Sequence, residues 1–125
     1  MKKMIAVLKR KPGMSFEDFR TYYDTRHVPL VKGLMGDNLI NYVRNYVDSD
    51  SPFAVGVKLD FDCVTEFHFV DDAAFERAVK AVEHPDNAPK VRADELNFLD
   101  MSYTKVAIVN VHDRTDGKPG LTAKS

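Results

Sequence analysis

The 125 residues suit a single domain with one hydrophobic core, and 18 Lys and Arg against 19 Asp and Glu leave a net charge of −1. Without a basic excess, no nucleic-acid partner and no anionic membrane surface is expected, and no apolar run is long enough to span a bilayer. The single cysteine, Cys63, excludes an intramolecular disulfide and, with the absence of a signal-like N-terminus, favours a cytoplasmic protein.

The first expected elements are a strand and a helix joined by a turn at Pro12-Gly13. Residues 4–8 are apolar at every position, which is typical of a strand buried on both faces. Ser15 is a suitable helix N-cap, and apolar side chains follow it at helical spacing. This inward stripe consists of Phe16, Phe19, Tyr23, His27 and Leu30. Pro29 then predicts the end of the helix, or a bend in it.

Two strands are expected in the middle of the chain. Residues 39–47 alternate, with Tyr42, Arg44 and Tyr46 on one face and Val43 and Val47 on the other. Residues 63–69 form a second alternating run. Phe67 and Phe69 are expected to pack under the helices, which turns Glu66 and His68 to the opposite face. Between the two strands, residues 48–52 form a loop by composition, and residues 53–62 fit either a surface loop or a short strand.

The last third of the chain predicts two helices and a strand. Asp71 can cap a helix whose apolar positions run from Phe75 to Val82. A shorter helix fits residues 86–99, and a strand rich in β-branched residues fits residues 102–112. Residues 113–125 are polar and aperiodic, which predicts a C-terminal tail beyond a domain of residues 1–112.

This order predicts an α+β domain, a ferredoxin-like βαββαβ unit with an antiparallel sheet and its helices on one face. Two helices cannot cover both faces of a four-stranded sheet. The face away from the helices, to which we assign the two tyrosines of residues 39–47, would therefore remain exposed. A second copy related by a two-fold axis is the simplest cover, so the sequence predicts a homodimer.

Three segments resemble the EthD family. The first is the basic strand end followed by P-G-M-S-F-E-D-F, Tyr22-Tyr23 and His27-Val28-Pro29-Leu30-Val31; the others are residues 64–69 and 93–100. The resemblance covers residues 4–112 and implies the dimeric α+β barrel fold. It constrains the fold more than the chemistry, because the activities of the family are poorly defined.

In such a dimer the uncovered sheet face would line a cavity for a small apolar organic ligand. The catalytic candidates are His27, which matches the family's H-x-P-L position and titrates near neutrality, and the strand pair His68 and Glu66. The candidates for substrate binding are Tyr23, Tyr42, Arg44 and Tyr46. If the pairing of a strand were shifted by one residue, its side chains would move to the opposite face of the sheet.

No cofactor and no metal is expected. The sequence has no dinucleotide fingerprint and no phosphate-binding loop. Two histidines and one carboxylate, His27, His68 and Glu66, could bind a metal only if the helix residue met the two strand residues. The sequence does not show that these side chains meet. Cys63 has no nearby Cys/His signature, which favours a small buried side chain over a nucleophile.

Two functions remain open at this point. The first is a cofactor-independent enzyme that works by general acid and base catalysis, as an isomerase, a dehydratase or lyase, or a cofactor-free oxygenase. Its substrate would be an apolar carbonyl, lactone or aromatic compound of a catabolic or polyketide-type pathway. The alternative is a non-catalytic binding or accessory protein of a degradation system such as ether degradation, with which the resembling family is associated.

Overall fold

The computed structural model describes residues 1–53 and 59–111. The predicted tail at 113–125, His112 and residues 54–58 lie outside the described residues. The elements in chain order are β1 (Lys2–Leu8), α1 (Phe16–Tyr22), the π-helical turn η1 (Tyr23–His27), α2 (Val28–Met35), the 3-10 turn η2 (Gly36–Asn38), β2 (Leu39–Tyr46), β3 (Cys63–Phe69), α3 (Asp72–Glu83), α4 (Ala88–Leu96) and β4 (Lys105–Val109).

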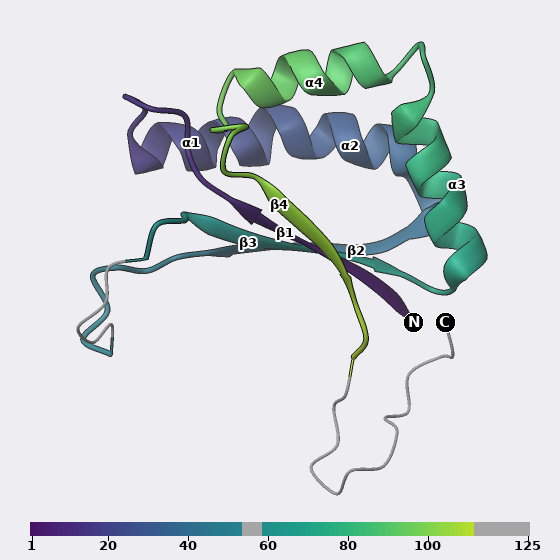
Figure 1. Cartoon of the computed structure of the whole chain (residues 1–125), viewed down its shortest axis with the longest axis horizontal. Coiled ribbons are helices and arrows are strands. Elements are labelled where there is room, and N and C mark those ends of the chain that lie inside the picture. The colour runs from purple at the N-terminus through teal and green to yellow at the C-terminus, as the bar shows by residue number, and fades with distance from the viewer. Residues whose placement is uncertain (54–58, 112–125) are drawn as a thin grey trace, which may run out of the picture.

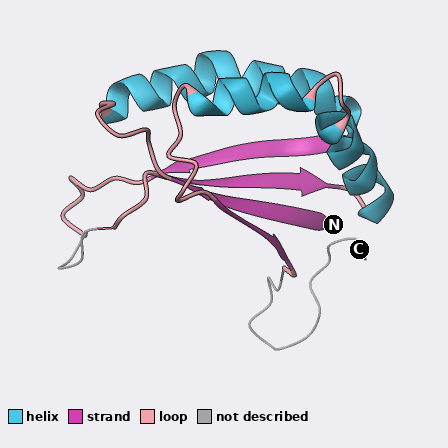
Figure 2. Ribbon diagram, turned by 45° about the horizontal axis from the view of Figure 1, so that its top comes forward, coloured by secondary structure: helices cyan, strands magenta, loops and turns pink. Residues whose placement is uncertain are grey.

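The four strands form one antiparallel sheet in the order β2-β3-β1-β4. All the helices lie on the same face of this sheet, as the side-on views show (Figures 1 and 2). The chain therefore has the α+β, ferredoxin-like βαββαβ architecture that its sequence predicts.

The helix starts follow the sequence signals. Ser15 caps α1 through its Oγ, which accepts a hydrogen bond from the Asp18 backbone N–H at 3.1 Å. The Asp71 carboxylate caps α3 in the same way by accepting from the Ala74 N–H at 2.9 Å. These two caps fix where the helices leave the loops, and so which side chains face the sheet.

The expectation that the first helix ends at Pro29 is wrong, because helical backbone continues to Met35. The proline follows η1, where the Val28 N–H reaches back to the Tyr23 carbonyl and the turn is one residue wider than an α-helical turn. This wider turn also aligns a stripe of buried residues at a spacing of four. They are Phe19, Tyr23, His27, Val31 and Met35. In a regular α-helix such a stripe would rotate by about 40° at each step, and the wide turn offsets part of that rotation.

The face assignment of β2 is also wrong. Tyr42 lies opposite Phe67 in the sheet, Arg44 lies opposite Thr65, and Tyr46 lies opposite Cys63. Because Phe67, Thr65 and Cys63 are buried under the helices, the three β2 side chains are on the helix side as well. The physical reason is that a tyrosine ring is mostly apolar and can be buried when its hydroxyl finds a partner.

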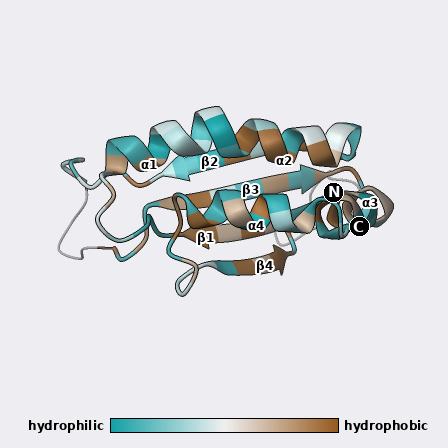
Figure 3. Ribbon diagram, turned by 90° about the horizontal axis from the view of Figure 1, so that it is seen from above, coloured by the Kyte–Doolittle hydropathy of each residue, from teal (hydrophilic) through white to brown (hydrophobic). Residues whose placement is uncertain are grey.

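The first strand is buried on one face only. Ala6 and Leu8 are buried toward the helices, whereas Ile5 and Val7 on the other face are half-buried. At the edge of the sheet, β4 has no described helix above it, as the view from above shows (Figure 3). Val106 and Ile108 consequently keep 59% and 47% of their surface exposed, although both are apolar.

Candidate active site

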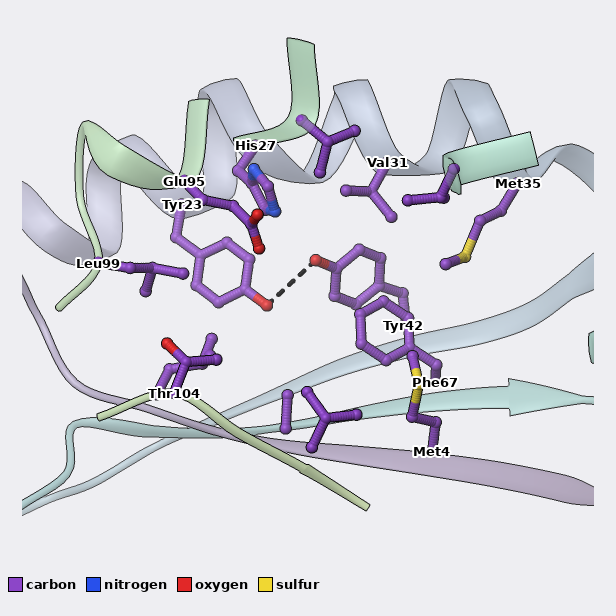
Figure 4. A pocket seen from close by; sticks show the side chains of 15 residues that line it. Met4, Tyr23, His27, Val31, Met35, Tyr42, Phe67, Glu95, Leu99 and Thr104 are labelled. Carbon is purple, nitrogen blue, oxygen red and sulfur yellow. Dashed lines mark hydrogen bonds between the residues drawn. The ribbon is translucent and has the colours of Figure 1, made fainter. Parts of the chain in front are cut away.

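A pocket of about 150 Å³ lies between the helices and the sheet. Helical side chains form its roof and strand side chains form its floor (Figure 4). Its lining residues are Met4, Ala6, Leu8, Tyr23, His27, Val31, Met35, Tyr42, Phe67, Val82, Val91, Glu95, Leu99, Thr104 and Val106. Because the half-exposed Val106 belongs to this lining, the pocket reaches solvent beside β4. None of the lining side chains is a lysine or an arginine, so the pocket favours a neutral, largely apolar ligand.

His27 lies in the roof of this pocket and is held by an acid from another helix. Its Nδ1 is 2.8 Å from the Asp94 Oδ2, and the other Asp94 oxygen accepts a 2.6 Å hydrogen bond from the Tyr22 hydroxyl. Burial lowers the pKa of His27 below its ordinary value of 6.5, although Asp94 acts in the opposite direction. Near neutral pH the ring is therefore neutral, with its proton on Nδ1, and Nε2 has a free lone pair. Within the described residues, Nε2 makes no hydrogen bond.

Two tyrosine hydroxyls form a short chain across the pocket. The Tyr42 hydroxyl donates to the Tyr23 hydroxyl at 3.1 Å (Figure 4). The Tyr23 hydroxyl also lies 2.7 Å from the Thr65 Oγ1. Burial raises the pKa of both tyrosines, so both remain protonated. The pair can orient a polar group of a ligand, but it cannot act as a phenolate base near neutral pH.

Glu95 also lines the pocket, from α4. Its side chain points into the space beside His27 and Tyr23 (Figure 4). Burial raises the pKa of this carboxyl above its ordinary value of 4.5. The pocket therefore contains an imidazole whose pKa is lowered by burial and a carboxyl whose pKa is raised by burial, in a mostly apolar setting.

Arg44 and Tyr46 lie beside the pocket and do not line it. The Arg44 Nε is 3.1 Å from the Asp24 Oδ1, and the Tyr46 hydroxyl donates to the same oxygen at 2.6 Å. This cluster ties β2 to the π-helical turn. It therefore fixes the position of Tyr23 and His27 over the sheet.

His68 and Glu66 are on the opposite face of the sheet from the pocket. Their side chains meet at 3.0 Å, and Glu66 also binds the Lys3 Nζ at 2.9 Å and the Asn45 Nδ2 at 2.8 Å. Hydrogen bonds from Lys3, His68 and Asn45 lower the pKa of Glu66 to about 2. The expectation that all seven predicted site residues share one cavity is therefore wrong, since the sheet separates these two from His27, Tyr23 and Tyr42.

Asp94 and Glu95 are site residues that were not predicted from the sequence. Asp94 is 67 positions from its partner His27, and no local pattern can connect residues so far apart in the chain. Glu95 did leave a signal, because it falls four residues after Val91 and four before Leu99, which are both buried. An acidic residue at a position where an apolar residue is expected indicates either a functional site or a destabilised helix.

The metal set considered from the sequence does not converge, because His27 is on the other side of the sheet from Glu66 and His68. Over residues 1–53 and 59–111, no group of three His, Cys, Asp or Glu side chains is placed to hold a metal ion.

Cys63 is fully buried, and burial raises the pKa of its thiol to about 11. Its thiol is therefore protonated, which disfavours a nucleophilic role. No helix in the described part of the chain is both long and apolar enough to cross a membrane.

Comparison with known proteins places the chain in a family. The EthD domain family matches residues 11–102. A conidial pigment biosynthesis dehydratase EthD from Metarhizium robertsii is 32% identical over 108 residues, which cover 79% of this chain and 74% of the relative. An EthD-like protein from Ralstonia eutropha has a similar structure, with a TM-score of 0.64, 21% identity, and coverage of 92% of this chain and 96% of the other. SnoaB, a cofactor-independent oxygenase from Streptomyces nogalater, matches with a TM-score of 0.59 at 11% identity, over 91% of this chain and 95% of its own. The family match and the dehydratase relative together show that this chain belongs to the EthD domain family.

Proposed function

We propose that this protein is a cofactor-independent lyase that removes a proton next to the carbonyl group of a small neutral ring compound. The observation that carries the proposal is the pair of His27 and Asp94, whose hydrogen bond leaves the neutral Nε2 of His27 facing an apolar pocket. The Metarhizium relative, at 32% identity, is named as a dehydratase, and dehydration is a lyase reaction.

The same geometry favours an enzyme over a passive carrier. A carrier needs only apolar walls, and a buried imidazole with a shifted pKa would add nothing to its binding of an apolar ligand. Burying His27 also lowers its pKa, which makes a charged ring costly in the folded state. A polar pair in a largely apolar pocket is typical of a catalytic site, where it supplies the proton transfer.

In the proposed reaction His27 is the general base. Asp94 accepts the Nδ1 hydrogen, fixes the tautomer and stabilises the imidazolium that forms when Nε2 takes the proton. The hydroxyl chain of Tyr42 and Tyr23 crosses the pocket and orients an oxygen of the ligand. A cavity of about 150 Å³ in another protein holds one benzene ring, so a single ring of this size fits here.

The experiment uses cyclohexanone in D₂O and follows the loss of its α-proton signals by NMR. We expect the wild-type protein to accelerate this exchange, and H27N to lower the protein-dependent rate at least roughly 100-fold. The matched control is H84N, because the His84 side chain is 55% exposed and lies outside the pocket. Exchange that survives in H27N and disappears in H68N would overturn the proposal and move the chemistry to the other sheet face.

A further inference from the structure

Glu95 occupies a position that packing alone would give to an apolar residue. It belongs to α4 and lies between Val91 and Leu99, which are both buried, at a spacing of four residues on each side. Leu96, the next residue, is apolar and 52% exposed, so the acid faces inward and the leucine faces solvent. This arrangement is the reverse of what stability favours, and such reversals concentrate at functional sites.

The surroundings of Glu95 leave its carboxyl free to meet a ligand. In the described part of the chain its side chain makes no hydrogen bond and no ion pair, although the charge of Arg92 acts on it, whereas its neighbour Asp94 is bound by both Tyr22 and His27. Glu95 and His27 enter the pocket from the helical roof, on the same side of the space above the strands (Figure 4). A ring lying in the pocket would therefore present one of its faces to both groups.

We propose that Glu95 is the acid partner of His27, and that the pocket removes water from a neutral cyclic ketone with a hydroxyl group on its β-carbon. This inference rests on the proposed function, because it requires His27 to be the base. It adds the leaving group, the second catalytic residue and the stereochemistry of the reaction.

The step balances without a cofactor. The α-carbon loses its proton to the Nε2 of His27, and the electrons of that C–H bond form the C=C bond as the C–O bond to the β-hydroxyl breaks. Glu95 gives its proton to the departing hydroxyl, which leaves as water. The imidazolium and the carboxylate then exchange protons with solvent, which restores the starting state. Burial raises the pKa of Glu95, against the opposing charge of Arg92, and burial lowers the pKa of His27, so each group is shifted toward the form that the step requires.

The position of His27 and Glu95 on the same, helical side of the pocket predicts the geometry of the elimination. Because both groups come from one side, the proton and the hydroxyl must leave from the same face of the ring, which is a syn elimination. The absence of lysine and arginine among the lining residues indicates that the ring bears no phosphate or carboxylate inside the pocket.

The test compares two leaving groups on one ring. With 3-hydroxycyclohexanone, E95Q should lose at least roughly 100-fold in the rate of enone formation, measured by ultraviolet absorbance. With 3-acetoxycyclohexanone, whose acetate leaves without protonation, E95Q should remain within a few-fold of wild type. The matched control is E76Q, because Glu76 is an exposed residue of α3 outside the pocket. Thermal unfolding should show E95Q to be at least as stable as wild type.

The outcomes separate this inference from the proposed function. A wild-type protein that exchanges the α-protons of cyclohexanone but does not dehydrate 3-hydroxycyclohexanone would overturn the inference and leave the proposed function intact. An equal loss with both leaving groups in E95Q would also overturn it, because an acid acts only on the group that needs a proton. With deuterium placed cis to the hydroxyl at the α-carbon, loss of the label supports the syn geometry, and retention of the label overturns it.

Discussion

At the scale of single residues, Asp94 and Glu95 show how adjacent acids take different roles. Successive side chains on an α-helix point about 100° apart, so the two carboxyl groups leave α4 in different directions. Asp94 does not line the pocket and binds His27 and Tyr22, whereas Glu95 lines the pocket. One acid therefore fixes the state of the base, and the other is free to meet the ligand.

The substitution D94N tests the first of these roles. A carboxylate only accepts hydrogen bonds, so it holds the His27 proton on Nδ1 and leaves Nε2 ready to accept a proton. The amide of asparagine can instead donate to Nδ1, which moves the ring proton to Nε2. We expect the α-proton exchange of cyclohexanone to fall at least roughly 100-fold. A variant that keeps the wild-type rate would show that Asp94 has no part in positioning the base.

The same variant predicts a change in pH dependence. Burial lowers the pKa of His27 and Asp94 raises it, so removal of the charge of Asp94 should move this pKa further below 6.5. Because the neutral ring is the base, the remaining activity of D94N should persist to lower pH than that of the wild type. Two other titratable groups face the ring, Tyr23 and Glu95; the charge of Asp94 also raises the pKa of Glu95, so that pKa should fall in D94N as well. An NMR titration of the His27 Cε1 proton measures the shift, and a raised pKa would contradict it.

At the scale of elements, most helices and strands could be predicted from the sequence, because their signals are local. Ser15 and Asp71 are caps that act within one turn, and the alternation of residues 63–69 matches β3. The wide turn at η1 and the continuation through Pro29 could not be predicted in this way. They depend on how the whole helix packs over the sheet, which no short window of sequence contains.

The candidate site was predictable in part, for the same reason. His27 and Tyr23 fell on the inward stripe of the first helix, and they are buried at the pocket. The orientation of Tyr42 could not be derived, because its alternating pattern is compatible with either face. What decides the face is a set of partners far along the chain: Tyr23 for the Tyr42 hydroxyl, and Asp24 for Arg44.

The edge strand β4 offers a test of how ligands reach the pocket. Val106 lines the pocket and is 59% exposed, because no described helix covers this strand. A tryptophan at this position would fill the open side of the pocket. We expect V106W to lower kcat/KM for cyclohexanone exchange at least about tenfold, which corresponds to about 1.4 kcal/mol, with little change in thermal stability.

The control for this prediction is I40W. Ile40 is 58% exposed and lies outside the pocket lining, so a tryptophan there changes the surface without narrowing the pocket. If V106W and I40W have equal rates, ligands enter by another path.

At the scale of the whole molecule, the sheet face opposite the helices is largely apolar at its centre and is left uncovered by the described helices (Figure 2). Its central side chains are apolar and half-buried: Ile5, Val7, Val43 and Val64. The polar groups among them satisfy one another, since Glu66 is bound by Lys3, His68 and Asn45. A face whose charges are already paired can be covered without leaving a buried charge alone.

We predict that a second copy of the chain covers this face and that the protein is a homodimer. A glutamate in place of Val64 would put an unpaired charge at the centre of that interface, between the neighbours Val7 and Asn45. In sedimentation experiments the wild type should run as a dimer and V64E as a folded monomer. V70E is the matched control, because Val70 follows β3 and is 51% exposed. A wild-type protein that sediments as a monomer would leave this face without a partner and contradict the prediction, whereas the pocket under the helices would remain intact.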